Sequence, residues 1–418
     1  MYKAVRGTSD ILPEEQAHWR YVEQGIVDVC NLYGYQRIDT PVFEDTELFS
    51  RSTGEYTDIV QKEMYTFDDR GGNSLTLKPE GTPPVCRAYI QHGLHNLPQP
   101  VKLYYLSPIF RYDRPQAGRY RQHYQFGCEA IGDDDPALDA EVIDMAWRFY
   151  GSLGLTGMSL QINSIGCKNC RPGYLSALQD HYRGYTEELC SDCKTRLEKN
   201  PLRLLDCKQA SCQAIANAAP KNTSYLCTQC AEHFSKLQKY LGLLEIPFKL
   251  DHRLVRGLDY YTRTVFEVMP RGGGAQSTIG GGGRYDDLIE ELGGRPTPAM
   301  GFATGIERII LNLKKQNVNV PVSPGLEVLV AYLGDGAGNE AIKLAASLRQ
   351  AGISAVTAAG GRSLKAQMRQ ANALGVGYTA IIGDDEVKAG TATLRDMANA
   401  RQETMPLAEV VRRLKHTD

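Results

Sequence analysis

The C-terminal segment, residues 326–418, constrains the fold most strongly, because strand-like and helix-like segments alternate there. LEVLVAYL, ISAVTA and YTAIIG are short apolar runs typical of buried strands, and the helical patterns NEAIKLAASLRQAG and SLKAQMRQANALG lie between them. Strands separated by helices pair in parallel, since each helix carries the chain back across the sheet. We therefore predict a small α/β domain over residues 326–418.

The segment NVNVPVSPG at 317–325 has two prolines and no apolar periodicity, which is typical of a linker. A chain of 418 residues exceeds the size at which one hydrophobic core stops growing, so at least two domains are expected. Before the linker we predict helices at 14–32, 138–153 and 304–316, and β-type runs at 36–43, 101–110, 122–131 and 246–285.

The composition changes between residues 163 and 235, where eight of the eleven cysteines occur in pairs and the breakers KNP and APKN interrupt helical stretches. This pattern predicts a helical, cysteine-rich domain at 163–235. It is inserted into a first domain that consists of residues 1–162 and 236–316.

The composition also excludes several classes of protein. No run reaches the roughly 18 apolar residues of a membrane helix, and the N-terminus meets acidic residues and a proline before any apolar block of a secretory signal. A net charge of -2 argues against a strongly basic nucleic-acid coat, but not against a local basic patch. We expect a cytoplasmic protein without a membrane segment.

The paired cysteines have the spacing of metal ligands. In a reducing compartment such spacing favours zinc over disulfides, and two sites of four thiolates would use Cys167, Cys170, Cys190, Cys193, Cys207, Cys212, Cys227 and Cys230. The alternative is that these cysteines pack as small apolar residues without metal. Cys30, Cys86 and Cys128 stand alone and are expected to be buried in this way.

Four other segments carry candidate functional residues. FRYDRPQAGRYRQHYQFGCE at 110–129 combines arginines with aromatic rings, which suits a polyphosphate and a stacked base. LVRGLDYYTRTVFE, IGGGGRYDDL and GFATGIERIIL follow it in the sequence. Each also has a plain structural alternative: a solvated basic hairpin, a strand with a tyrosine edge, a glycine turn, and an arginine that extends from its helix to solvent.

Together these segments resemble the class II histidyl-tRNA synthetases. FRYDRP resembles motif 2 of the class, GFATGIERI resembles motif 3, and LVRGLDYYTRTVFE and GGGGRYD resemble the two histidine-specific signatures. VRGTSDILP, TGEYTDIVQKEMYTF and KPEGT are similar to the family as well. The resemblance implies an α+β fold: a catalytic domain on an antiparallel sheet, an insertion that contacts the tRNA acceptor arm, and a C-terminal α/β anticodon-binding domain. It also implies a homodimer formed through the region around Pro41.

The activity implied by the resemblance is that of a histidine–tRNA ligase, which activates L-histidine with ATP and Mg²⁺ and transfers it to tRNA(His). In such enzymes Arg111 and Arg256 would be catalytic, Arg119 and Arg308 would hold the outer phosphates, and His123 would stack on adenine. The histidine pocket would be formed by Glu80, Thr82, Gln125, Glu129, Tyr260 and Tyr261.

Two residues depart from the family pattern. Asp113 stands where a glutamate is common, and His123 stands where a phenylalanine commonly stacks on adenine. A shorter acid would reach the nucleotide through water, and a smaller ring would weaken the adenine contact.

The main alternative to a ligase is a histidine-sensing regulatory subunit of ATP phosphoribosyltransferase. Such subunits typically lack the C-terminal domain and the arginine signatures, and both are present here, so the ligase is favoured.

Two further alternatives concern segments of the C-terminal domain. The run Gly334-x-Gly336-x-Gly338 has a misplaced third glycine and no acidic residue after ISAVTA, so a dinucleotide site is not expected. Arg362, Lys365 and Arg369 form a basic stripe that is either an RNA contact or a solvated helix face.

Overall fold

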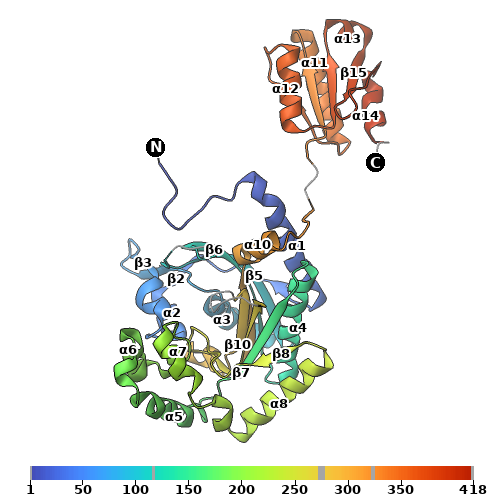
Figure 1. The fold of residues 1–418 in the computed structure, drawn as a ribbon. Coiled ribbons are helices and arrows are strands. Elements are labelled where there is room, and N and C mark those ends of the chain that lie inside the picture. Colours follow the sequence, from blue (N-terminus) through green and yellow to red (C-terminus); the bar gives the residue numbers. More distant parts are fainter. Residues whose placement is uncertain (1, 115–117, 272–277, 322–324, 416–418) are drawn as a thin grey trace. The chain divides into compact units, whose positions relative to one another are not determined.

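The structure is a computed structural model that describes residues 2–114, 118–271, 278–321 and 325–415. It contains two compact units, residues 1–320 and residues 321–418, shown in Figure 1. The division lies within the predicted linker at 317–325, part of which is outside the described residues. Among the described helices, none is long and apolar enough to cross a membrane.

The first unit is built on an eight-stranded sheet in which all neighbouring strands are antiparallel except the two edge pairs. In spatial order the strands are β1 (Gln36–Arg37), β5 (Val101–Phe110), β6 (Gln122–Ile131), β11 (Ala299–Gly305), β10 (Gly280–Arg284), β9 (Thr262–Pro270), β7 (Met158–Ser164) and β8 (Phe248–Leu250). A smaller antiparallel sheet has the order β2 (Phe43–Asp45), β4 (Ser74–Leu77) and β3 (Tyr65–Asp68). The predicted antiparallel architecture is therefore confirmed.

The glycine run forms the central strand β10, so the alternative of a simple glycine turn is wrong. A Cβ on Gly282 would lie 1.9 Å from the carbonyl oxygen of Gly301, and one on Gly281 would lie 2.5 Å from that of Phe266. Neighbouring strands approach too closely for a side chain at these positions. The run thus lets β10 pack between β9 and β11.

Helices cover both faces of the large sheet because its strand residues alternate between two apolar clusters. On one face α1 (Gln16–Leu32), α4 (Pro136–Ser152) and α10 (Ile306–Lys315) pack on aromatic residues such as Phe126 and Phe302. The other face carries α3 (Thr82–Gln91) and α9 (Leu288–Glu291). The remaining short helices before β7 are η1 (Pro13–Glu15), α2 (Thr46–Thr53), η2 (Ile59–Glu63) and η3 (Leu94–Asn96). As predicted, Cys30, Cys86 and Cys128 are fully buried.

The cysteine-rich region is helical, as expected, and in Figure 1 it gathers at one end of the first unit. Its elements are α5 (Arg171–Arg183), η4 (Thr186–Glu188), α6 (Ser191–Lys199), η5 (Pro201–Leu204), α7 (Ala210–Asn217), η6 (Asn222–Tyr225) and α8 (Thr228–Leu243). Helix α8 returns the chain to α4, where His233 Nε2 lies 2.8 Å from a carboxylate oxygen of Asp139. The other oxygen of Asp139 accepts a hydrogen bond of 2.6 Å from the fully buried Arg284.

The second unit has a five-stranded sheet of order β13-β12-β14-β15-β16. The three strands that the sequence predicts, β12 (Val328–Tyr332), β13 (Ala355–Thr357) and β14 (Tyr378–Ile382), are parallel. The sequence did not predict β15 (Thr391–Asp396) and β16 (Gln402–Pro406), which extend the sheet in antiparallel fashion. The mostly exposed edge strand β16 carries no apolar run by which it could be recognised.

The described part of the second unit also contains the helices α11 (Asp335–Gln350), α12 (Leu364–Leu374), α13 (Asp384–Ala389) and α14 (Leu407–Lys415). Because α11 begins at Asp335, Gly336 and Gly338 lie inside a helix and form no phosphate-binding loop. Lys365 and Arg369 are exposed on α12, whereas Arg362 precedes the helix and its N-cap, Ser363. The predicted stripe therefore begins two residues before the first helical residue, Leu364.

Candidate active site

A cavity of about 420 Å³ lies over the large sheet and receives side chains from β6, β9 and the loop that joins β5 to β6. Its wall includes the predicted residues Glu80, Thr82, Arg111, Arg119, His123, Gln125, Arg256, Tyr260, Tyr261 and Arg308. Among the predicted substrate-binding residues, Glu129 alone is not part of this wall. The cavity thus gathers predicted residues from four separate segments of the sequence.

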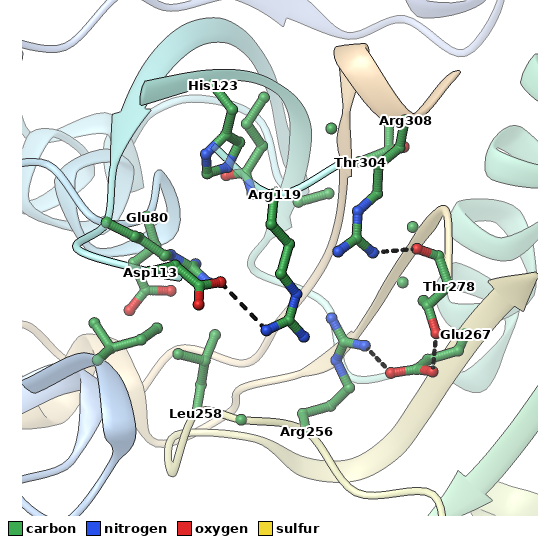
Figure 2. A pocket seen from close by; sticks show the side chains of 18 of the residues that line it. Glu80, Asp113, Arg119, His123, Arg256, Leu258, Glu267, Thr278, Thr304 and Arg308 are labelled. Carbon is green, nitrogen blue, oxygen red and sulfur yellow. Dashed lines mark hydrogen bonds and ion pairs between the residues drawn. The ribbon is translucent and has the colours of Figure 1, made fainter. Parts of the chain in front are cut away.

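Four arginines surround one end of the cavity, and each is held by a protein acceptor. Arg111 Nε donates to the carbonyl oxygen of Pro79 at 2.7 Å, and Arg119 forms an ion pair of 3.3 Å with Asp113. Arg308 Nε donates to the carbonyl oxygen of Gly118 at 3.0 Å. Figure 2 shows the guanidinium groups of Arg119, Arg256 and Arg308 pointing into the same space.

Arg256 is positioned by a carboxylate that the sequence analysis did not single out. It forms an ion pair with Glu267, and the hydroxyl of Thr278 donates to the second oxygen of Glu267 at 2.7 Å. Glu267 is the last residue of the motif LVRGLDYYTRTVFE, so its place in the motif was a usable signal. The arrangement leaves the Arg256 Nε without a hydrogen-bond partner in the described residues.

The charge at this end is suited to an anion. Burial, reinforced by the nearby charges of Arg119 and Arg111, lowers the pKa of Arg308. Positive groups that lower one another's pKa in this way are stabilised when a polyanion binds between them. This end of the cavity can therefore hold several phosphate groups.

His123 on β6 borders the arginines. Burial of its ring, together with the charges of Arg111 and Arg308, lowers its pKa to about 3. The imidazole is therefore neutral near pH 7, and a neutral ring can stack on an aromatic base without repelling the arginines.

The opposite end of the cavity is lined by a glutamate and by tyrosines. Glu80 is buried, and its two carboxylate oxygens accept hydrogen bonds from Thr53 at 2.5 Å and Tyr260 at 2.8 Å. Burial raises the pKa of Glu80. Gln125 accepts a hydrogen bond of 3.2 Å from Tyr105, a residue that the sequence analysis missed. A buried carboxylate with polar neighbours is suited to a small cationic ligand.

Glu129 lies behind this wall. Its oxygens accept hydrogen bonds from Thr82 at 2.7 Å and Tyr285 at 2.5 Å, and Thr82 itself lines the cavity. Burial raises the pKa of Glu129 to about 8. Glu129 thus lies one side chain behind the cavity wall, where β6 pairs it with Gly301 of β11.

Residues of the cysteine-rich region also line the cavity, which the sequence analysis did not predict. They are Arg203, Asp206 and Lys208. No periodicity marks them, but Asp206 and Lys208 flank Cys207, which was a candidate metal ligand.

The eight paired cysteines form two separate groups of four. One group contains Cys167, Cys170, Cys227 and Cys230, and the other contains Cys190, Cys193, Cys207 and Cys212. Within each group all the sulfur atoms lie within 4.8 Å of one another. The Sγ–Sγ distances are 3.8 Å for Cys167–Cys170 and 3.9 Å for Cys170–Cys230, far too long for disulfide bonds.

An arginine-lined cavity on a predominantly antiparallel sheet, combined with a separate α/β unit, defines a class II aminoacyl-tRNA synthetase. The sequence profile described as histidyl-tRNA synthetase matches residues 7–309, and the profile described as an anticodon binding domain matches residues 327–417. The chain belongs to the histidyl-tRNA synthetase family.

Individual relatives cover nearly the whole chain. The histidine–tRNA ligase of Dehalococcoides mccartyi is 60% identical over 415 residues, which are 99% of each protein. That of Pelotomaculum thermopropionicum is 53% identical over 410 residues, covering 98% of this chain and 96% of the relative. The crystal structure of apo S. aureus histidyl-tRNA synthetase has a TM-score of 0.83 at 40% identity, covering 99% of this chain and 100% of that chain.

Proposed function

We propose that the chain is a histidine–tRNA ligase that acts in the cytoplasm, where its tRNA substrate is found. The observation that carries the proposal is one cavity with arginines at one end and a buried, hydroxyl-bound carboxylate at the other. The first end suits the triphosphate of ATP, and the second suits the amine and imidazole of histidine.

The first step is attack of the histidine carboxylate on the α-phosphorus of ATP, which forms histidyl-adenylate and releases pyrophosphate. A ribose hydroxyl at the 3′ end of tRNA(His) then attacks the acyl carbon, and AMP leaves. The attacking group is already an anion, so the protein has to align it and stabilise the charge that develops on phosphorus. We assign this task to Arg111 and Arg256.

Arg119 and Arg308 hold the outer phosphates in this proposal. Mg²⁺ bound to ATP would add positive charge there, and Asp113 and Glu267 are carboxylates of the cavity wall beside the arginines. We assign histidine recognition to Glu80, Thr82, Gln125, Tyr260 and Tyr261. Glu129 supports this pocket through Thr82.

Histidine-dependent ATP–pyrophosphate exchange tests the proposal. We expect the purified protein to catalyse it and Arg256→Ala to reduce turnover about 10²- to 10³-fold, with a smaller change in KM, because the lost charge acts mainly in the transition state. A wild-type protein without exchange activity would instead favour a histidine-sensing regulatory subunit of ATP phosphoribosyltransferase. An Arg256→Ala variant with normal turnover would contradict only the assigned role.

We also infer a homodimer formed through the segment around Pro41. Apolar side chains in the small sheet and directly before it are exposed: Val42 is 40%, Phe43 47% and Phe67 44% exposed. Adjacent exposed apolar groups of this kind favour a partner surface. Sedimentation of wild type should give twice the chain mass, and Phe43→Glu should give the monomer. A monomeric wild type would contradict the inference.

The cysteine groups are proposed zinc sites. Four thiolates around Zn²⁺ at about 2.3 Å place their sulfur atoms about 3.8 Å apart. The distances of 3.8 Å for Cys190–Cys207 and 3.9 Å for Cys167–Cys227 support this fit. Bound zinc would cross-link short helices that bury few apolar residues. Protein purified without added zinc should contain two zinc ions per chain, and a folded protein without zinc would end the proposal.

A further inference from the structure

The second cysteine group lies at the two ends of a loop that reaches the active-site cavity. Cys190 and Cys193 are at the start of α6, and Cys207 and Cys212 follow η5. The stretch from Lys194 to Asp206 therefore leaves this group and returns to it. We call this stretch the cavity loop.

The cavity loop is tied by arginines to a carboxylate of the cavity wall. Arg196 and Arg203 both form ion pairs with Asp58, at 3.3 Å and 3.4 Å. Asp58 directly precedes η2, and both Asp58 and Glu63 at the end of η2 line the cavity. Arg203 also forms an ion pair of 3.3 Å with Asp206, the residue directly before Cys207. This pair links the cavity loop to its end beside the cysteine group.

A second connection leads from the cavity loop to the proposed histidine pocket. Asn200 donates a hydrogen bond of 2.8 Å to the carboxylate of Asp259. The backbone N–H of Asp259 donates to the carbonyl oxygen of Thr53, whose hydroxyl binds Glu80. Three consecutive hydrogen bonds thus connect the loop to Glu80.

Besides the cysteine group, the cavity loop is held by these polar ties and by the buried side chains of Leu197, Leu204 and Leu205. Helices α6 and α7 are nine and eight residues long, and helices this short are marginal by themselves in water. The buried residues of α6 are Cys193 and Leu197 only. A metal ion that joins all four thiolates would fix both ends of the loop at once.

We propose that the metal site formed by Cys190, Cys193, Cys207 and Cys212 positions the cavity loop and thereby controls the affinity of the active site for histidine. The proposal rests on the zinc sites and the ligase activity proposed above. It assigns the site an effect on binding: the four cysteines are not part of the cavity wall, so loss of the metal raises the KM for histidine and leaves turnover nearly unchanged.

Two single substitutions in the full-length protein test this. Cys212→Ser removes one thiolate that does not line the cavity, and Arg196→Gln removes one tie to Asp58 while both metal sites stay intact. We expect Cys212→Ser to contain one zinc ion fewer than wild type. In ATP–pyrophosphate exchange both variants should raise the histidine KM about three- to tenfold, as expected for a lost hydrogen-bonded contact, with kcat within about twofold.

The matched control is Arg183→Gln, since Arg183 lies in the same region but pairs only with the exposed Asp180 among the described residues. Its kinetics should equal those of wild type. An unchanged histidine KM in a Cys212→Ser protein that has lost one zinc ion overturns the proposal. Should Cys212→Ser fail to fold, Arg196→Gln decides alone, and normal kinetics there overturn it.

Failure of the parent proposals gives different results. If wild-type protein contains no zinc but catalyses ATP–pyrophosphate exchange normally, the zinc sites are wrong and this inference fails with them. The proposed ligase activity is then still supported. If wild-type protein contains two zinc ions but lacks exchange activity, the zinc sites are supported and the proposed ligase activity is wrong. This inference then fails because it rests on that activity.

Discussion

His123 shows how one residue is adapted to a strongly positive site. With a pKa of about 3, its ring is neutral at physiological pH and adds no charge beside Arg111 and Arg308. A neutral imidazole stacks on adenine with less apolar area than a phenyl ring. In the proposed ATP site, His123 therefore offers less contact area and more polarity than a phenylalanine would.

Replacing His123 by phenylalanine should strengthen the adenine contact. We expect His123→Phe to lower the KM for ATP about two- to fivefold, in line with the gain of an aromatic contact, and His123→Ala to raise it. Exchange assays at varied ATP and saturating histidine measure both. Because the His123 ring is already neutral, the KM of wild type for ATP should show no step between pH 6 and 8 from protonation of this side chain. A rise of KM in His123→Phe would contradict the stacking role.

Glu129 links stability to pH. Its folded pKa of about 8 lies above the ordinary 4.5, so the unfolded chain gives up this proton at a lower pH than the folded chain does. Stability therefore falls as the pH rises from about 4.5 to 8. Glu129→Gln does not titrate and should be more stable than wild type by about 4 kcal/mol at pH 8, and by less than about 1 kcal/mol near pH 5, since each pKa unit is worth about 1.4 kcal/mol.

Urea denaturation at the two pH values measures this difference, and histidine binding should weaken in the same variant. The exposed Glu232→Gln on α8 serves as a control and should leave stability unchanged at both pH values. A Glu129→Gln gain that is equal at pH 5 and pH 8 would show that the effect does not come from the carboxylate proton.

At the scale of elements, a buried charge cluster joins three parts of the first unit. Asp139 on α4 binds Arg284 at the end of β10 and His233 on α8. Burial alone would raise the pKa of Asp139, but Arg284 and His233 bring it below its ordinary value of 3.8. Its contribution to stability is therefore present above pH 3.8 and is lost only as the pH falls through the lower folded pKa.

Asp139→Ala leaves the guanidinium of Arg284 buried with an incomplete set of partners. We expect this to cost about 3 kcal/mol or more of unfolding free energy, measured by urea denaturation at pH 7. Asp180→Ala, which breaks an exposed ion pair with Arg183, should cost less than about 1 kcal/mol. Equal losses in the two variants would mean that the buried cluster does not hold these elements together.

The sequence predicted the elements best where an apolar pattern is local. The predicted strands at 101–110 and 122–131 coincide with β5 and β6, and the helix at 14–32 begins two residues later as α1. Strand β16 was missed because its residues are mostly exposed. Local patterns such as spacing and apolar periodicity therefore account for most of the fold.

The site was predictable only in part, because its geometry depends on contacts between distant residues. The arginine motifs contain the four arginines that line one end of the cavity. The depth of Glu129 follows from the register between β6 and β11, and the arrival of Arg203 at the cavity follows from the path of the cavity loop. Neither leaves a periodic signal in the sequence.

At the scale of the whole molecule, recognition of small molecules and recognition of tRNA fall to different units. The cavity and its small-molecule chemistry lie within residues 1–320, whereas the profile of an anticodon binding domain covers residues 327–417. A substitution in the second unit should therefore affect tRNA charging and leave histidine activation unchanged. The exposed basic residues Arg362, Lys365 and Arg369 provide a direct test, because nucleic-acid affinity depends on contacts with phosphates.

We expect the triple variant Arg362→Gln, Lys365→Gln, Arg369→Gln to raise the KM for tRNA(His) about tenfold or more, while ATP–pyrophosphate exchange stays at the wild-type rate. If each residue contacts one phosphate, the slope of log affinity against log salt should become smaller by about 2, since each contact contributes about 0.7 to 0.9. Lys388→Gln is the control, because Lys388 pairs with Asp385 in the same unit. An unchanged salt slope in the triple variant would identify the stripe as a solvated helix face and place the RNA contacts elsewhere on this unit.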